Sequence, residues 1–115
     1  MQNVRELKIW QKSRELVRLV YQVTRKFPDD ERFGLTTQMR RCSVSIPSNI
    51  AEGQMRPSNK MFKQFISIAR GSCAELETQN LLAADLGFID DKTHEQLHGK
   101  ITEVAKMLSS FYATL

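Results

Sequence analysis

The sequence predicts an all-α protein, an antiparallel up-and-down bundle of four helices. Apolar residues recur at spacings of three and four along most of the chain, which is the period of a helix buried on one side. Groups of Pro, Gly, Ser and Asp interrupt this pattern at three points, and no stretch alternates as a strand does. The 115 residues are expected to form a single domain, residues 1–115, because the chain is too short for a core domain plus a separate catalytic one.

The first two helices are expected over residues 3–27 and 35–55. Pro28 ends the first helix, and an acidic cluster after it supplies a polar turn. Gly34 precedes the second helix, which contains Pro47. Because proline has no backbone N–H and its ring clashes with the preceding turn, the second helix is predicted to kink there.

The other two helices are expected over residues 58–86 and 90–114. The third follows the stop-and-cap signal Pro57-Ser58-Asn59 and ends at Gly87. Asp90 caps the fourth, whose apolar residues keep a seven-residue rhythm to the C-terminus. Each linker is short, which is typical of helices that pack antiparallel to their neighbours.

The predicted bundle has more apolar surface than its core needs. On the first helix, Trp10, Val17 and Tyr21 lie beside the main apolar face, and on the fourth helix Met107 and Tyr112 lie beside the heptad positions. Surplus apolar surface usually marks self-association, so we expect these residues to contact other copies. The alternative is that they are half-exposed packing within one chain.

Three further residues are expected in the interior of the bundle. Cys42 and Cys73 are expected to be reduced, buried and without a redox role, a disulfide between them being the alternative. Gly71 weakens the middle of the third helix and suggests a close helix contact. The chain has no run of about 18 apolar residues and no secretory signal at its start, so we expect a cytoplasmic protein that does not bind membranes.

The stretch from Arg40 to Gly53 is the most informative, because it combines a helical apolar period with serines, an asparagine and a proline that a core helix would avoid. It belongs to a wider set of motifs: Phe27-Pro28, Glu31 with Phe33-Gly34-Leu35-Thr36, Gln38 with Arg40-Arg41, Ser45-Ile46-Pro47, Asn49-Ile50-Ala51-Glu52-Gly53, and Ala69-Arg70-Gly71-Ser72 with Glu75-Leu76. In these motifs the chain resembles the four-helix-bundle proteins of the 23S rRNA intervening-sequence family, related to the accessory bundle proteins of diversity-generating retroelements. The resemblance covers nearly the whole chain and implies a ring-like homopentamer.

The polar residues of these motifs are expected to have structural roles. We expect Glu52 and Glu75 to pair with Arg41 or Arg70 from facing helices or a neighbouring subunit, and Ser45 and Asn49 to satisfy backbone groups freed by the proline. A polar pocket for a small ligand at the kink is the functional alternative. The full structural signature is Arg40, Arg41, Ser45, Pro47, Asn49, Glu52, Gly53 and Glu75.

Charge is distributed unevenly along the chain. Residues 1–70 hold 14 Lys and Arg against 6 Asp and Glu, a net charge of +8, whereas residues 71–115 hold 3 against 7, a net charge of −4. The basic residues of the first and third helices fall at helical spacing, which suits a phosphate backbone because each neutralised phosphate releases condensed counterions. The predicted nucleic-acid-binding residues are Arg14, Arg18, Arg25, Arg56, Lys60, Lys63 and Arg70.

Two alternatives to this binding site stay open. Charged residues on the outside of a bundle are commonly just solvated. The protein could instead be an interaction scaffold, for example an accessory subunit of a polymerase or reverse transcriptase, without direct contact to nucleic acid. No aromatic ladder is interleaved with the basic rows in the sequence, so contact with RNA or DNA backbones is favoured over reading of single-stranded bases.

One motif suggests an enzyme. His94-Glu95-Gln96-Leu97-His98 has the spacing of a zinc protease, with two histidines for the metal and a glutamate to activate water. No third ligand follows at a recognised interval and no strand is predicted to align a peptide. We therefore interpret His94 and His98 as a chance match, able at most to bind adventitious Zn or Ni, and expect a non-enzymatic protein with no cofactor, no catalytic residue and no metal site.

Overall fold

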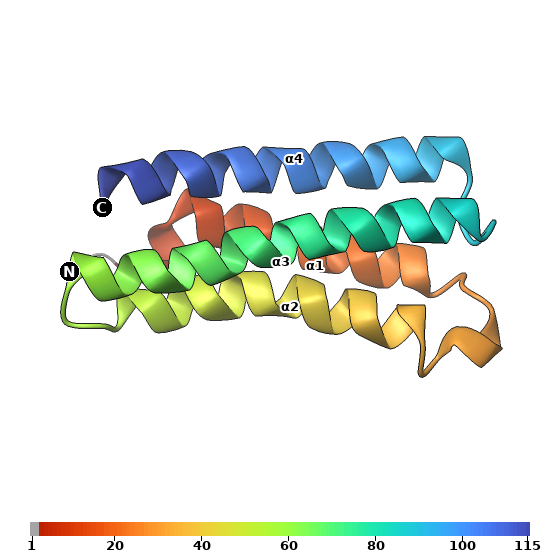
Figure 1. The fold of residues 1–115 in the computed structure, drawn as a ribbon, viewed down its shortest axis with the longest axis horizontal. Helices are drawn as coiled ribbons and strands as arrows, with labels where there is room; N and C mark the ends of the chain where they lie inside the picture. The colour runs from red at the N-terminus through yellow and green to blue at the C-terminus, as the bar shows by residue number, and fades with distance from the viewer. Residues whose placement is uncertain (1–2) are drawn as a thin grey trace.

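The structure is a computed structural model that describes residues 3–115, and these residues form four α-helices and two short 3-10 turns without any strand (Figure 1). The elements are η1 (Val4–Glu6), α1 (Lys8–Thr24), η2 (Asp29–Glu31), α2 (Leu35–Gln54), α3 (Asn59–Asp85) and α4 (Asp91–Thr114). The predicted all-α, four-helix fold is confirmed. None of the described helices is long and apolar enough to cross a membrane.

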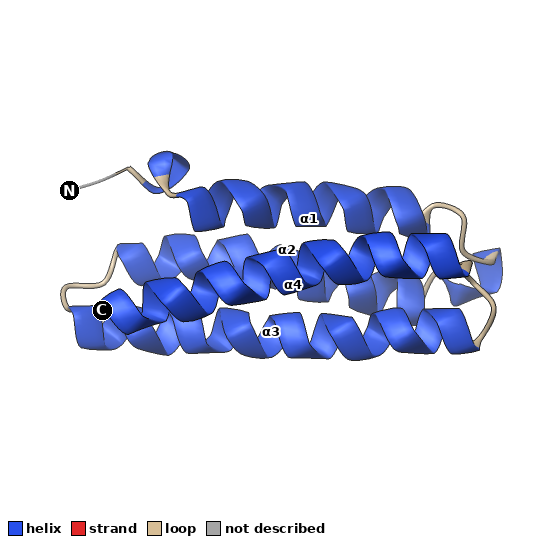
Figure 2. Cartoon of the chain, turned by 90° about the horizontal axis from the view of Figure 1, so that it is seen from above, coloured by secondary structure: helices blue, strands red, loops and turns tan. Residues whose placement is uncertain are grey.

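Each helix packs against two others around one core. α1 contacts α2 and α4, and α3 contacts the same two helices, but α1 and α3 do not contact each other in the described part of the chain. Figure 2 accordingly shows α1 and α3 at opposite edges of the bundle, with α2 and α4 between them. Successive helices run in opposite directions along the long axis (Figure 1). α1 and α3 are therefore diagonal partners with outward faces on opposite sides of the molecule.

The core is apolar and receives side chains from all four helices. At a rise of 1.5 Å per residue, the 27 residues of α3 extend about 40 Å, close to the 44 Å length of the whole molecule. One continuous core therefore runs the length of the bundle. Its fully buried side chains include Leu16, Val20, Met39, Ile46, Ile50, Ile66, Leu76, Leu97, Val104 and Leu108.

The first helix is shorter than predicted at both ends, because α1 ends at Thr24 and not at residue 27. Residues 4–6 form the turn η1, in which the Asn3 side chain accepts a hydrogen bond from the Arg5 backbone N–H at 2.9 Å. Leu7 then has an extended backbone and a buried side chain, and α1 begins only at Lys8. The expected start at residue 3 was wrong because the apolar period cannot distinguish a buried side chain on a helix from one placed by an extended residue.

The remaining ends follow local capping chemistry. The Ser58 side chain accepts a hydrogen bond from the Met61 backbone N–H, and the Asp90 side chain accepts one from the Thr93 backbone N–H. α3 ends before Gly87, whose φ of +77° favours glycine. The predicted caps at Ser58 and Asp90 and the stop at Gly87 are confirmed.

Helix α2 is continuous from Leu35 to Gln54, with Pro47 inside it. The ring removes the N–H that would bond to the Ser43 carbonyl one turn earlier. Asn49 Nδ2 donates instead to the Ser45 carbonyl at 2.7 Å, and Ser45 Oγ donates to the Cys42 carbonyl at 2.6 Å. The two side chains therefore bond the Cys42 and Ser45 carbonyls and not the freed Ser43 carbonyl, so the expectation that they satisfy it was wrong. The kink at the proline stays a prediction.

The exposed apolar surface is not where the sequence placed it. Trp10, Met107 and Tyr112 are half-buried and pack against the core, and Val17 and Tyr21 are also half-buried. Their contact with other copies stays a prediction. The large apolar side chains that are exposed gather on other elements. They are Phe33, Val44, Met55, Met61, Ile68, Leu81, Leu82 and Leu86.

Helices α2 and α3 approach each other closely at Gly53, near the end of α2. A Cβ atom placed on this glycine would lie 2.6 Å from Phe65 Cβ and 2.8 Å from Phe62 Cδ1, both on α3. Two side chains would have to move, one of them close to the backbone of α3. Only glycine therefore fits between the two helices here.

We expect Gly53→Ala to lower the free energy of unfolding by about 1–3 kcal/mol, the range for overpacking a filled core. Urea denaturation at neutral pH measures this. The matched control is Gly99→Ala on α4, where an added Cβ meets nothing within 4 Å, so that the higher helix propensity of alanine should stabilise it by up to about 1 kcal/mol. Equal effects of the two variants would contradict the close-packing argument.

Candidate nucleic-acid interface

The predicted basic residues lie on two separate surfaces. Arg14 and Arg18 are exposed on α1 and Arg25 is exposed at its C-cap, whereas Lys60, Lys63 and Arg70 belong to α3. Because α1 and α3 do not contact each other in residues 3–115, one continuous surface cannot include both rows within a single chain. The seventh predicted residue, Arg56, lies in the turn between α2 and α3.

The row on α1 is unpaired, although Arg18 lines a hollow together with Glu15 and Glu103. Within the described residues, none of Arg14, Arg18 and Arg25 forms an ion pair. Arg14 lies over the Trp10 ring at 4.9 Å from its centroid. The row therefore offers exposed guanidinium groups that form no ion pair with an acidic side chain of the described chain.

A fourth arginine from α2 joins this side of the molecule. The Arg40 guanidinium lies 4.6 Å from the centroid of the Tyr21 ring on α1. Its Nε donates a hydrogen bond to Thr24 Oγ1 at 2.9 Å. These two contacts hold the Arg40 charge beside α1, and they were not predictable without knowing how α1 and α2 pack.

Two hollows follow the α1 row, each of about 500 Å³. Each combines two arginines with one aromatic residue. The first is lined by Arg5, Trp10, Gln11 and Arg14, and the second by Val17, Arg18, Tyr21, Gln22 and Arg25. The spacing of these residues along one helix gives the surface a repeated arrangement of cations.

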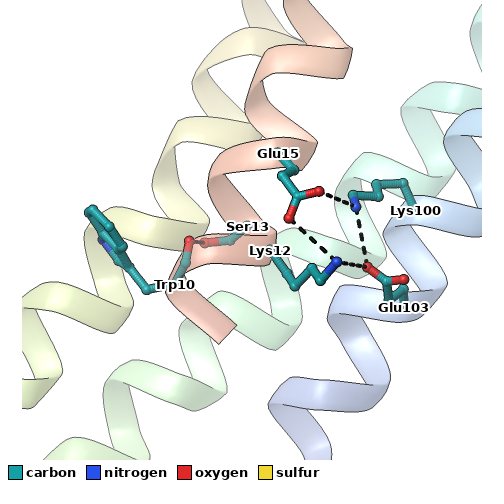
Figure 3. Close-up of polar contacts among 6 residues, drawn as sticks. All are labelled: Trp10, Lys12, Ser13, Glu15, Lys100 and Glu103. Atoms are coloured by element: carbon teal, nitrogen blue, oxygen red, sulfur yellow. Dashed lines mark hydrogen bonds and ion pairs between the residues drawn. The ribbon is translucent and has the colours of Figure 1, made fainter. Parts of the chain in front are cut away.

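On the side of α1 that faces α4, two lysines form ion pairs with two glutamates (Figure 3). Glu15 lies 3.1 Å from Lys100 of α4 and 3.5 Å from Lys12, and Glu103 lies 3.3 Å from Lys100 and 3.9 Å from Lys12. The hydrogen bond from Lys100 holds the pKa of the Glu15 carboxyl below its ordinary value. The two lysines between α1 and α4 are therefore engaged, whereas the arginine row on the other side of α1 forms no ion pair.

The row on α3 is more engaged than the sequence suggested. Lys63 and Arg70 both lie over the Tyr112 ring on α4, at 5.0 and 5.1 Å from its centroid. Arg56 forms an ion pair with Glu52 at 3.0 Å and lies over the Phe65 ring. Arg56 thus precedes α3 and is partly neutralised, which corrects its placement on one face of the third helix.

Aromatic rings do accompany the basic residues, contrary to the expectation from the sequence. Trp10 precedes Arg14 by four residues, a spacing from which this contact could have been found. Tyr112 lies more than forty residues from Lys63 and Arg70, so its contacts with them depend on how α3 and α4 pack. Each ring has a cation over it, which leaves that side of the ring unavailable for stacking with a base.

The signature residues form a polar seam between α2 and α3. The hydroxyl oxygens of Ser45 and Ser72 are 2.6 Å apart, and Cys42 Sγ donates to the Ser72 carbonyl at 3.1 Å. Burial raises the pKa of the Cys42 thiol to about 12 and that of the Cys73 thiol to about 11. Both cysteines are free and buried, so they pack as small neutral groups at this seam.

The expected pairing of the signature carboxylates is not present within the described chain. Glu52 pairs with Arg56, one turn away across the end of α2. Glu75 Oε2 accepts a weak hydrogen bond from Cys42 Sγ at 3.7 Å. Arg70 lies over the ring of Tyr112 on α4. Arg41 is exposed and forms no ion pair in residues 3–115. The prediction of pairs between Glu52 or Glu75 and Arg41 or Arg70 was therefore wrong for one chain.

The two histidines of the zinc-protease motif lie on α4. His98 Nδ1 is 2.9 Å from Glu77 Oε1 of α3, and the rings of His94 and His98 are 6.3 Å apart. Among the described residues, no three His, Cys, Asp or Glu side chains come together as a metal would require. The Glu77 carboxylate raises the pKa of His98 by its hydrogen bond and its charge, so this pair links α3 to α4 most strongly when His98 is protonated.

We expect His98→Gln to destabilise the protein more at about pH 6 than at about pH 9. A group whose pKa is raised on folding contributes stability below its unfolded pKa and loses that contribution as pH rises through the folded pKa. Urea unfolding midpoints of wild type and variant at the two pH values measure the difference. Glu77→Gln is the matched control and should show the same trend, whereas equal destabilisation at both pH values would contradict this account.

The comparisons with known proteins agree with this architecture. The chain is similar to a crystal structure described as a protein with unknown function from the S23 ribosomal protein family of Bacteroides thetaiotaomicron, with a TM-score of 0.79 and 27% sequence identity over 90% of this chain and 97% of that one. No curated protein matches. Residues 5–110 match the family described as 23S rRNA-intervening sequence protein. The chain therefore belongs to the 23S rRNA-intervening sequence protein family.

Proposed function

We propose that this protein is a non-enzymatic, homo-oligomeric bundle that binds RNA or DNA through the outward face of α1. The observation that carries the proposal is the row of Arg14, Arg18 and Arg25, exposed and without ion pairs in the described residues. The other side of the same helix is neutralised by Glu15 and Glu103. A helix with one paired side and one unpaired side concentrates its positive potential on the second.

The geometry favours contact with the sugar-phosphate backbone. Arg14 and Arg25 are eleven residues apart, which corresponds to about 16 Å along a helix, and the charges of one strand of a duplex follow each other about every 3.4 Å. The row can therefore meet several phosphates. The Trp10 and Tyr21 rings beside it already have guanidinium groups over them, so base stacking contributes little and the contact is tolerant of sequence.

We expect the triple variant Arg14→Gln, Arg18→Gln, Arg25→Gln to bind structured RNA or duplex DNA more weakly, with a salt slope reduced by about one unit for each lost contact. Fluorescence anisotropy at about 50 and 200 mM salt measures this, with single-stranded DNA as the third ligand. Trp10 is the only tryptophan, and its fluorescence should change when nucleic acid covers Arg14.

The matched control is Lys60→Gln, Lys63→Gln, Arg70→Gln, which removes the same charge from α3. It should lower the salt slope less than the α1 variant and leave the change in Trp10 fluorescence in place. The reverse ranking would move the interface to α3. Absence of binding to all three nucleic acids at the lower salt would reject nucleic-acid binding and leave the scaffold function.

Exposed apolar residues support the second part of the proposal, self-association or a protein partner. Met61, Ile68 and Leu82 of α3 are exposed at multiples of seven residues, and Leu86 follows one turn later. Ile68 is 53% exposed and Leu86 60%, although both are large aliphatic side chains. Such a row along one helix is typical of an interface between proteins. The homopentamer implied by the family resemblance belongs to this proposal.

We expect Ile68→Ser with Leu82→Ser to lower the assembly mass measured by light scattering after gel filtration, because removing two apolar contacts weakens an interface. The Arg14, Arg18, Arg25 variant is the control and should keep the wild-type mass. An unchanged mass in the serine variant would place the subunit contacts elsewhere. Loss of partner binding in the serine variant alone would favour the scaffold function.

A further inference from the structure

A groove of about 880 Å³ runs between α3 and α4, away from the arginine row on α1. Its floor is made of small or aliphatic side chains, among them Gly71, Ala74, Ala105 and Ile101, and hydroxyl groups follow its edges. The volume lies within the range of sites for small molecules. The groove is also separate from the apolar row of Met61, Ile68 and Leu82, none of which lines it.

Gly71 has no explanation within its own chain. A glycine in the middle of a helix costs about 1 kcal/mol relative to alanine, and at Gly53 a close neighbour explains it. At Gly71 an added Cβ would meet nothing within 4 Å, so the close helix contact expected from the sequence is not made inside the chain. The missing side chain instead keeps space open in the groove.

The charges in the groove favour an anion. Arg70 and Lys106 both line it, and neither forms an ion pair within the described residues. Glu77 is the one carboxylate in its lining, and it is held by His98 at 2.9 Å. Two cations without carboxylate partners therefore face an apolar floor, an arrangement that suits a molecule with an anionic head and an apolar body.

We propose that the groove between α3 and α4 binds a small organic anion, with its acidic group at Arg70 and Lys106 and its apolar body over Gly71, Ala74 and Ala105. The site does not depend on the proposed nucleic-acid interface, because that interface lies on α1, which does not contact α3 in the described chain. The proposed site also gives a role to Arg70, which lies over Tyr112 of α4 and takes no part in the seam between α2 and α3.

Fluorescence titration with 8-anilinonaphthalene-1-sulfonate tests the proposal, since this probe joins a sulfonate to an apolar aromatic body. Saturable binding of one probe per chain is expected. Arg70→Gln with Lys106→Gln should raise the Kd of the probe about tenfold, because the charge-assisted contacts with its sulfonate are lost. Gly71→Leu fills the groove and should abolish binding, whereas the matched Gly99→Leu, also at an open glycine position of a helix, should bind as wild type does.

Two further measurements separate the groove from other surfaces and identify the ligand. The Ile68→Ser, Leu82→Ser variant should keep the probe affinity, because those residues lie outside the groove. Displacement of the probe by dodecanoate or by AMP supports the proposal and distinguishes an aliphatic from a nucleotide body, while displacement by neither overturns it. The proposal also fails if Gly71→Leu leaves the probe affinity unchanged, or if Gly71→Leu changes the assembly mass without changing that affinity.

Discussion

The close contact between α2 and α3 is the constraint on which the rest of the structure depends. At one end of this contact, Gly53 leaves no room for a Cβ beside Phe65, and near its middle the Ser45 and Ser72 hydroxyls meet at 2.6 Å. An apolar close approach and a polar seam together fix how far α3 is turned about its own axis. That rotation decides which residues of α3 face α4, so it places Arg70 beside Tyr112 and Gly71 at the open groove.

The same packing sorts the charges of the chain into paired and unpaired groups. Between α1 and α4, two lysines and two glutamates neutralise one another. Glu52 and Glu77 are engaged by Arg56 and His98. The arginines on the outward face of α1 have no such partners within residues 3–115. A net charge of +4 is therefore less informative than the separation of paired from unpaired cations.

Sequence reasoning succeeded at the helix caps, missed the local contacts of Arg14 with Trp10 and of Arg56 with Glu52, and failed where partners are distant along the chain. The Asp90 cap reaches the backbone N–H only three residues away, so the residue types and their spacing suffice to predict it. The contact of Lys63 and Arg70 with Tyr112 joins two helices, and its prediction requires the rotation of both about their axes. The start of α1 failed for another reason: Leu7 is buried on an extended backbone, and burial alone does not reveal backbone conformation.

The diagonal placement of α1 and α3 separates the two proposed sites within one chain, because no described Cα atom of α1 lies within 8 Å of a Cα atom of α3. Substitutions at sites that share no partner and lie more than about 7–10 Å apart usually have additive free energies. A ligand over Gly71 would therefore neither compete with a polyanion held by Arg18 nor alter its affinity through a shared side chain. Any linkage between the two proposed ligands would have to travel through α2 or through α4, which lines the groove and pairs with α1 through Lys100 and Glu103.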